Sequence, residues 1–393
     1  MWVKKRHKII FAILRLPFKI FLKLKYNYFA VKYKLEKKPY LILSNHLTTL
    51  DPFMLACSFK RPIYFMTSTD LFSNKYGRLI EYLVAPIPKS KSVKDIGAIK
   101  GCLRVVKEKG TICVFPEGNR SYDGTQCHID PSISKLVKMM KIDVVLYNIH
   151  GGYGIDPRWC KKGRKGFAYG KVKRVLKYEE IEKMDNDELY KLILNELKVS
   201  EYPTPYTFKT RNMALGLERV LYVCPNCGSV QTIYTEGNFV KCSHCDLEVK
   251  YNKNLTLTSK NPNFKFQFMN EWYKYQIEYV KNYDFNHQKV IYKDENIQLL
   301  KMHYRAKGEP LGKGTLEIDQ NCFRIRTNTE VFEFPLKSIF SSTVLGKHKL
   351  NFYIDKETYQ IKGKDDFNAL KYMQMYYHIQ NKLKGEEDNF FGM

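Results

Sequence analysis

Long apolar runs are missing from this 393-residue chain. No stretch reaches the roughly 18 uninterrupted apolar residues that a membrane-spanning helix needs. The apolar runs near the amino terminus are broken by Arg15, Pro17, Lys19 and Lys23, and no small-residue cleavage site follows them. The sequence therefore predicts neither a spanning helix nor a cleavable secretory signal. Internal repeats and low-complexity tracts are also missing, and a hydrophobic fraction of 44% supports packed domains.

Acidic residues are scarce relative to basic ones: 40 Asp and Glu against 66 Lys and Arg leave a formal net charge of +26. Such an excess predicts an anionic partner, which is nucleic acid, an acidic membrane surface, or a phosphorylated or CoA-like substrate. The alternative is a genome-wide bias toward Lys, which would produce the charge without any partner.

Cysteines number ten and are too dilute for a secreted disulfide scaffold. Four of them form two Cys-x-x-Cys pairs, Cys224 with Cys227 and Cys242 with Cys245, separated by 14 residues. This spacing is typical of a structural zinc ribbon rather than of a disulfide or of unliganded thiols. We expect structural zinc and a reducing, cytoplasmic compartment. The segment 221–250 is not markedly basic, which argues against nucleic-acid binding by the ribbon.

Four regions are expected along the chain: a basic amphipathic segment over 1–38, a main domain over 39–208, the ribbon over 209–255 and a β-rich domain over 256–393. The first contains twelve Lys or Arg and one acid, mixed with apolar residues at helical spacing. This mixture favours a helix lying in a membrane interface. The alternative is a helix packed on the main domain with its Lys side solvated. Pro17 is expected to bend or interrupt the helix.

The main domain alternates short buried strands with helices, which predicts an α/β fold whose largely parallel central sheet is flanked by helices. The expected strands are Tyr40–Leu43, Ile63–Met66, Thr111–Phe115 and Val144–Ile149, and the expected helices are Pro52–Phe59, Ile96–Lys107 and Ile133–Met140. The proline-containing segment Glu201–Phe208 is expected to be a linker.

The region after the ribbon begins with an aromatic-rich helix predicted over 268–282. Six short strands then follow, at 297–303, 314–318, 322–326, 331–334, 349–354 and 359–361, and a helix over 365–382 comes last. Antiparallel strands closed by one helix resemble the pleckstrin-homology-like fold in topology, although no motif carries that resemblance.

Two strings suggest the chemistry. Asn45-His46 follows a strand, and Asp51 lies five residues later, across a turn that can fold its carboxylate onto the imidazole. An imidazole oriented in this way can take a proton from an alcohol. In isolation, the same pair can equally be a loop histidine and a helix cap.

The second string is a turn that follows another strand, made by Glu117, Gly118, Asn119, Arg120 and Ser121. Its backbone N–H groups and its guanidinium suit a phosphate. The alternative is a plain turn between a strand and a loop.

Together, NHLTTLD (Asn45–Asp51) and FPEGNRS (Phe115–Ser121) resemble two motif blocks of the glycerolipid acyltransferase superfamily, which includes the lysophosphatidic acid acyltransferases. The resemblance covers roughly residues 35–200. Asn119 stands where the family usually has Thr. In the block over 85–103, Lys89 or Lys91 stands where the family has an arginine that contacts the acceptor phosphate. Lys keeps the charge and loses the bidentate fork.

The resemblance implies acyl transfer from acyl-CoA or acyl carrier protein to a lysophospholipid hydroxyl, with 1-acyl-sn-glycerol 3-phosphate as the expected acceptor. It implies that His46 is the general base and that Asp51 orients it. The implied substrate-binding residues are Asn45, Lys89, Lys91, Glu117, Gly118, Asn119, Arg120 and Ser121. No catalytic cofactor is implied. We expect a peripheral or monotopic protein at the cytoplasmic face of a membrane. The alternatives are an inactive lipid- or protein-binding adaptor, or an enzyme for another lysolipid or for glycerol 3-phosphate.

Overall fold

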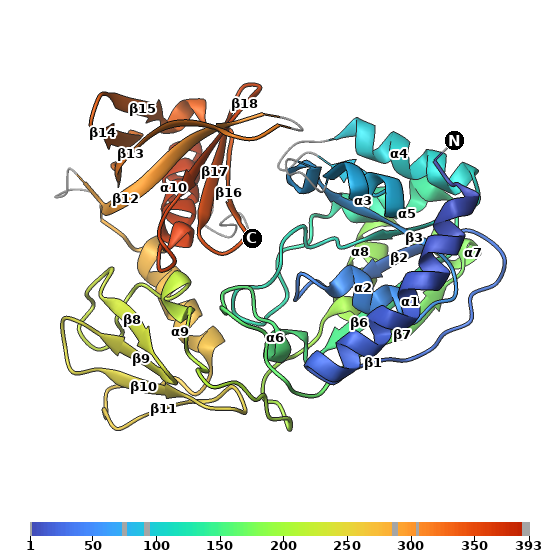
Figure 1. Cartoon of the computed structure of the whole chain (residues 1–393), viewed down its shortest axis with the longest axis horizontal. Helices are drawn as coiled ribbons and strands as arrows, with labels where there is room; N and C mark the ends of the chain where they lie inside the picture. Colours follow the sequence, from blue (N-terminus) through green and yellow to red (C-terminus); the bar gives the residue numbers. More distant parts are fainter. Residues whose placement is uncertain (1, 73–76, 90–94, 285–289, 304–305, 387–393) are drawn as a thin grey trace. The chain divides into compact units, whose positions relative to one another are not determined.

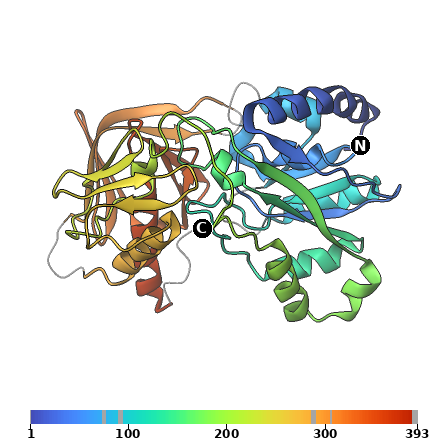
Figure 2. The same cartoon turned by 90° about the horizontal axis from the view of Figure 1, so that it is seen from below.

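The computed structural model describes residues 2–72, 77–89, 95–284, 290–303 and 306–386. The chain divides into two compact units. The first comprises the residues up to Arg158 together with Lys162–Thr210, and the second comprises Trp159–Lys161 and the residues from Arg211 onward. Figures 1 and 2 show the elements of each unit from two directions.

The first unit is built on a seven-stranded sheet with the order β1-β7-β6-β2-β5-β3-β4. The strands are β1 (Tyr28–Ala30), β2 (Leu41–Ser44), β3 (Ile63–Ser68), β4 (Ile87–Lys89), β5 (Thr111–Val114), β6 (Val144–His150) and β7 (Ala168–Leu176). Strands β2, β3, β4, β5 and β6 run parallel to one another, whereas β7 pairs antiparallel with β6. The largely parallel sheet is confirmed, and so are the four predicted strands.

Helices cover both faces of this sheet, as the sequence predicted (Figure 2). They are α1 (Lys5–Tyr26), α2 (Asp51–Ala56), α3 (Gly77–Val84), α4 (Ile96–Lys107), α5 (Ser132–Met140), α6 (Gly152–Ile155), α7 (Tyr178–Lys183) and α8 (Asn186–Leu197), with a 3₁₀ turn, η1, at Thr69–Phe72. On one face, side chains of α4, α5 and α8 form a single apolar core with β2, β5 and β6. Both α1 and α2 contact β1, and α2 also contacts β6 and β7. Strands covered on both sides are continuously apolar because neither face meets water.

The amino-terminal helix α1 runs through Pro17 without interruption, and the bend expected at Pro17 stays a prediction. A proline inside a helix removes one backbone hydrogen bond, and packing along the helix can offset that loss. Phe18, next to Pro17, stacks on Phe53 of α2 with ring centroids 4.5 Å apart. Trp2, just before the helix, donates its indole N–H to the Ala85 carbonyl at 2.8 Å.

Most apolar side chains of α1 face outward. Its buried residues are His7, Leu22 and Tyr26. The large apolar residues that remain exposed are Ile9, Ile13, Leu16, Ile20, Phe21 and Leu24. Among the described residues, no helix combines the length and the apolar character required to cross a bilayer.

The second unit contains two antiparallel sheets. The four-stranded sheet has the order β11-β10-β9-β8, from β8 (Ile233–Glu236), β9 (Phe239–Cys242), β10 (Glu248–Tyr251) and β11 (Leu257–Ser259). The seven-stranded sheet has the order β15-β14-β13-β12-β18-β17-β16. Its strands are β12 (Tyr292–Met302), β13 (Glu309–Ile318), β14 (Cys322–Thr327), β15 (Val331–Pro335), β16 (Ser341–Leu345), β17 (Lys349–Ile354) and β18 (Glu357–Lys362).

Two helices complete this unit, α9 (Met269–Lys281) and α10 (Ala369–Lys384), with 3₁₀ turns η2 (Leu217–Arg219) and η3 (Leu336–Ser338). Gln276 of α9 accepts from the Tyr222 N–H at 2.7 Å and donates to the Val220 carbonyl at 2.9 Å. The Tyr222 hydroxyl donates to Gln374 of α10 at 2.6 Å. These bonds join the segment before Cys224 to both helices. The β-rich character and the closing helix are confirmed, and the pleckstrin-homology-like assignment stays a prediction.

Candidate active site

The two residues predicted to be catalytic and the predicted phosphate-binding turn lie at one edge of the first sheet. Strand β2 lies between β5 and β6, parallel to both, with Leu43 paired to Val114 and to Leu146. Parallel neighbours end at the same edge, so the loops that follow them lie side by side. The loop after β2 therefore meets the turn after β5 and the loop after β6.

His46 and Asp51 form a close pair. Nδ1 of His46 lies 2.7 Å from Oδ2 of Asp51, and the same oxygen accepts the N–H groups of Leu47 at 2.6 Å and Thr48 at 2.9 Å. The other oxygen, Oδ1, accepts the Thr48 hydroxyl at 2.8 Å. The Asp51 side chain is fully buried, whereas the His46 side chain is 20% exposed. Because Asp51 accepts at Nδ1, the other ring nitrogen, Nε2, is left free to take a proton.

Glu117 supports the backbone of His46. Its Oε1 accepts the His46 N–H and its Oε2 accepts the Cys127 N–H, both at 2.9 Å. The Ser121 N–H donates to the His46 carbonyl at 3.2 Å. Burial raises the pKa of Glu117 to about 8, against the lowering effect of the two backbone donors. The turn after β5 thus holds both backbone polar groups of the histidine.

Asn45 connects β2 to β6. Its amide nitrogen donates to the Ile149 carbonyl at 2.9 Å, and its amide oxygen accepts the Ile149 N–H at 2.8 Å. Asn45 is buried, with 3% of its surface exposed. Both ends of its side chain are therefore bonded to backbone, and the bonds fix the start of the His46 loop.

The turn after β5 depends on one glycine. Gly118 has φ +67°, a left-handed conformation that strains other residues. The Asn119 N–H donates to the Glu117 carbonyl at 2.7 Å, which tightens the turn. Ser121 is fully buried, and its hydroxyl donates to Asp123 and accepts the Gly124 N–H. These contacts orient Arg120, which lies between Asn119 and Ser121.

Arg120 points toward the His46 loop. Its Nη1 donates to the Thr49 hydroxyl at 2.8 Å. Arg158, in the loop after α6, donates from Nη1 to the Arg120 carbonyl at 3.3 Å and is 4% exposed. Sequence reasoning missed Arg158, because a single arginine in a loop carries no spacing signal.

The structure describes one of the two lysines that were predicted to contact the acceptor phosphate. Lys89 is the last residue of β4, at the same sheet edge as the other loops, and it is exposed. Lys91 lies outside the described residues.

The segment Glu201–Phe208, predicted to be a linker, packs on the first unit. Glu201 accepts the Gly151 N–H at 2.9 Å and is 4% exposed. Burial raises the pKa of Glu201 to about 7, against the lowering effect of N–H groups of Gly151, Gly154 and Tyr153. Phe208 is fully buried, and its ring fills the space that a side chain at Gly154 would need. Sequence reasoning missed this support of the loop after β6.

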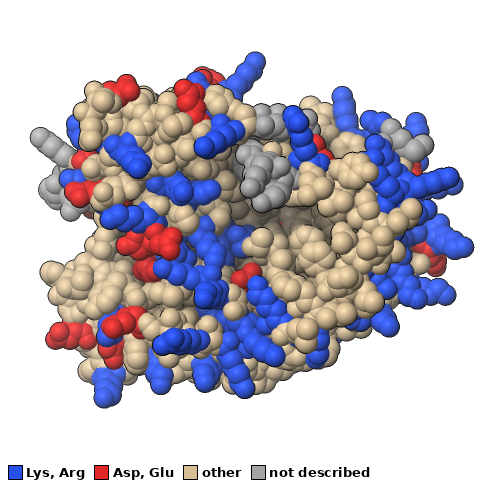
Figure 3. Space-filling model, in the orientation of Figure 1, with Lys and Arg blue, Asp and Glu red and all other residues tan. Residues whose placement is uncertain are grey.

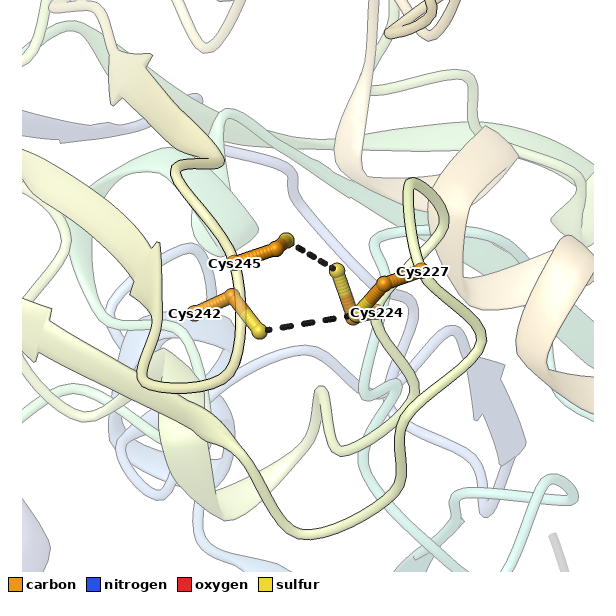
Figure 4. Close-up of side chains that lie close together, drawn as sticks. All are labelled: Cys224, Cys227, Cys242 and Cys245. Atoms are coloured by element: carbon orange, nitrogen blue, oxygen red, sulfur yellow. Dashed lines mark hydrogen bonds between the residues drawn. The ribbon is translucent and has the colours of Figure 1, made fainter.

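The four cysteines of the predicted ribbon, named here the four-cysteine cluster, lie together in the second unit (Figure 4). All four sulfur atoms lie within 4.8 Å of one another. The Cys224–Cys245 sulfur distance is 3.7 Å, and the Cys227–Cys242 distance is 3.9 Å. Four thiolates about 2.3 Å from a tetrahedral zinc ion are separated by about 3.8 Å. The cluster can therefore hold a structural metal ion of this kind.

Parts of the chain are similar to known proteins. Residues 28–149 match the family described as Acyltransferase. The 1-acyl-sn-glycerol-3-phosphate acyltransferase of Saccharomyces cerevisiae is 38% identical over 94 residues, which cover 22% of this chain and 30% of that protein. The chain thus spans less than a third of the length of that curated relative.

Two solved structures are similar to parts of the chain. The 1-acyl-sn-glycerophosphate acyltransferase PlsC of Thermotoga maritima is 17% identical, with a TM-score of 0.42, over 49% of this chain and 78% of its own. A chain of the 8S snRNP assembly intermediate is 14% identical, with a TM-score of 0.18, over 27% of this chain and 91% of its own.

The matched residues include the His46 loop and the turn at Glu117. Over residues 28–149 the chain is similar to the acyltransferase family, in agreement with the resemblance of its two motif blocks.

Proposed function

We propose that the protein transfers a fatty acyl group from acyl-CoA or acyl carrier protein to the hydroxyl of a lysophospholipid. The expected acceptor is 1-acyl-sn-glycerol 3-phosphate, and the product is then phosphatidic acid. The observation that carries the proposal is the 2.7 Å contact between His46 and a fully buried Asp51, inside a domain of acyltransferase type.

The chemistry requires one base and no cofactor. Nε2 of His46 takes the proton of the acceptor hydroxyl while that oxygen attacks the thioester carbonyl carbon. Asp51, held by three further donors, stabilises the imidazolium that forms. The C–S bond of the tetrahedral intermediate then breaks, and the departing thiolate takes the proton back from His46. An ester and a free thiol result.

The turn after β5 has two roles in this proposal. Arg120, with Lys89, binds the phosphate of the acceptor, since a guanidinium and an ammonium are suited to phosphate oxygens. Glu117 positions the histidine backbone and does not contact the phosphate, because both of its oxygens accept backbone N–H groups.

We further propose that the protein works on a membrane surface, at its cytoplasmic face. The exposed apolar side chains of α1 alternate with Lys and Arg, a pattern that suits anionic headgroups. Over the first unit, Figure 3 shows many more basic than acidic side chains in this view. The four-cysteine cluster is proposed to bind one structural zinc ion.

The test is an acyl-transfer assay with His46→Ala. Purified wild type and variant are mixed with acyl-CoA and with vesicles that contain either 1-acyl-sn-glycerol 3-phosphate or another lysolipid, and thiol release and the acylated product are both measured. Loss of the general base should lower kcat by at least about 100-fold. Lys173→Ala, a change at an exposed residue of β7, is the control for surface substitution. A folded His46→Ala protein with near-normal transfer would contradict the proposal, and transfer to another lysolipid alone would correct the acceptor.

A further inference from the structure

Two arginines from separate loops meet beside the His46 loop. Arg120 belongs to the turn after β5, and Arg158 follows α6 after β6. The guanidinium carbon of Arg158 lies 4.1 Å from the centre of the Tyr122 ring, and Nη1 donates to the Arg120 carbonyl at 3.3 Å. Arg158 therefore fixes the backbone of Arg120, whose own side chain bonds to Thr49.

The positive charges of Arg120 and Arg158 repel one another. Burial and then Arg158 lower the pKa of Arg120 to about 10, and the nearby carboxylates of Asp156 and Asp51 offset this only in part. Two partly desolvated cations gain most from a ligand that brings two negative charges, because one charge leaves part of the repulsion in place.

We propose that Arg158 is a positioning residue for the acceptor phosphate, and that it makes the site prefer a phosphate monoester to a phosphodiester. Arg158 acts by holding the Arg120 backbone and by adding a second positive charge next to Arg120. A monoester carries close to two negative charges at neutral pH, and a diester carries one. This inference rests on the proposed function and names the headgroup chemistry that this site selects.

The experiment compares Arg158→Gln, Arg158→Lys and wild type in the full chain. Each is assayed with a monoester acceptor, 1-acyl-sn-glycerol 3-phosphate, and with a diester acceptor, lysophosphatidylglycerol, in vesicles of the same composition. Arg174→Gln is the matched control, since it removes one arginine charge at a half-exposed ion pair of β7 and α8.

Arg158→Gln should raise the monoester KM by about 10- to 100-fold, the range expected for lost charge-assisted contacts. The KM for acyl-CoA and the kcat should change by less than about three-fold, and the monoester-to-diester preference should fall because the monoester KM rises. The monoester KM of Arg158→Lys should lie between those of wild type and Arg158→Gln. Lysine keeps the positive charge but cannot form the paired hydrogen bonds of a guanidinium. If Arg158 only supported the fold, its loss would raise the KM values of the monoester and diester acceptors together.

An unchanged monoester preference in a folded Arg158→Gln protein overturns the inference. If the Arg158→Gln protein does not fold, the Arg158→Lys protein is the test. A wild-type monoester KM in Arg158→Lys would then also overturn the inference. If wild type transfers no acyl group, the proposed function fails. Calorimetry with glycerol 3-phosphate then decides the inference separately: about ten-fold weaker binding by the variant supports it, and equal or undetectable binding by both proteins overturns it.

Discussion

Replacing Asp51 by asparagine should separate catalysis from folding in this site. Three donors share Oδ2, and one hydroxyl donates to Oδ1. In Asp51→Asn the amide oxygen can accept the same three donors. The amide nitrogen can donate to the Thr48 hydroxyl, which also accepts the Leu50 N–H. The network keeps its shape, and only the charge is lost.

The magnitude follows from these contacts. Each bond to a charged acceptor is worth about 1 kcal/mol more than its neutral counterpart, while the cost of burying the charge is removed at the same time. We therefore expect the free energy of unfolding to change by no more than about 2 kcal/mol. In the transition state, by contrast, the imidazolium loses a carboxylate partner. Unit charges about 4 Å apart attract by about 4 kcal/mol at an effective dielectric constant of about 20. Since about 1.36 kcal/mol corresponds to ten-fold in rate, kcat should fall by roughly 100- to 1,000-fold.

The measurement is kcat by thiol release at saturating substrates, beside denaturant unfolding of the same preparations. The matched control is Asp143→Asn. Asp143 is also a buried carboxylate with several donors, namely Lys38, Lys177 and the Tyr178 N–H, but it precedes β6 and so lies at the opposite edge of the sheet. That control should keep its kcat within about two-fold. An Asp51→Asn protein that folds and retains more than a tenth of the wild-type kcat would refute the role given to this carboxylate.

Three further predictions concern stability. Burial raises the pKa of Glu117 to about 8 and that of Glu201 to about 7, so the folded chain binds these protons more tightly than the unfolded chain does. Their stabilising contribution is therefore full below about pH 4 and is lost as the pH rises to 8, and Glu117→Gln should flatten urea unfolding free energies measured from pH 5 to 9. In Gly154→Ala the new Cβ would lie 2.1 Å from Phe208, so the melting temperature should fall by several degrees and Phe208→Leu should restore part of it. Metal analysis should find one zinc ion per chain, and chelation should unfold the ribbon by circular dichroism, whereas a metal-free protein with an unchanged melting curve would reject the zinc assignment.

The sequence predicted the elements whose stability is local. Helix α4 has the predicted bounds, Ile96–Lys107, and Asp95 caps it by accepting the Ala98 N–H at 3.0 Å. The apolar strands of the parallel sheet were equally visible, because burial on both faces demands continuous apolar runs. The pair of His46 and Asp51 was predictable for a similar reason, since Asp51 lies five residues after His46, across one turn.

Elements that depend on tertiary pairing were missed. Strand β7 contains Lys171, Lys173 and Arg174 and has no apolar run. It forms because β6 and β1 supply hydrogen bonds on both of its sides. Helix α8 was also missed, although its capping box, Asp185 with Glu188, was a readable signal. Arg158 had no such signal, because its position depends on how two distant loops meet.

These omissions bear on where the acyltransferase unit ends. The family match stops at residue 149, within β6, yet that strand pairs with β7 over its whole length. Arg158 and Glu201, which hold the loops of the candidate site, lie beyond the match as well. A chain cut at residue 149 would lose β7 and so expose the edge of β6. We therefore propose that the functional unit extends to about residue 208. A fragment of residues 1–210 should fold and bind glycerol 3-phosphate, and a fragment of residues 1–149 should not.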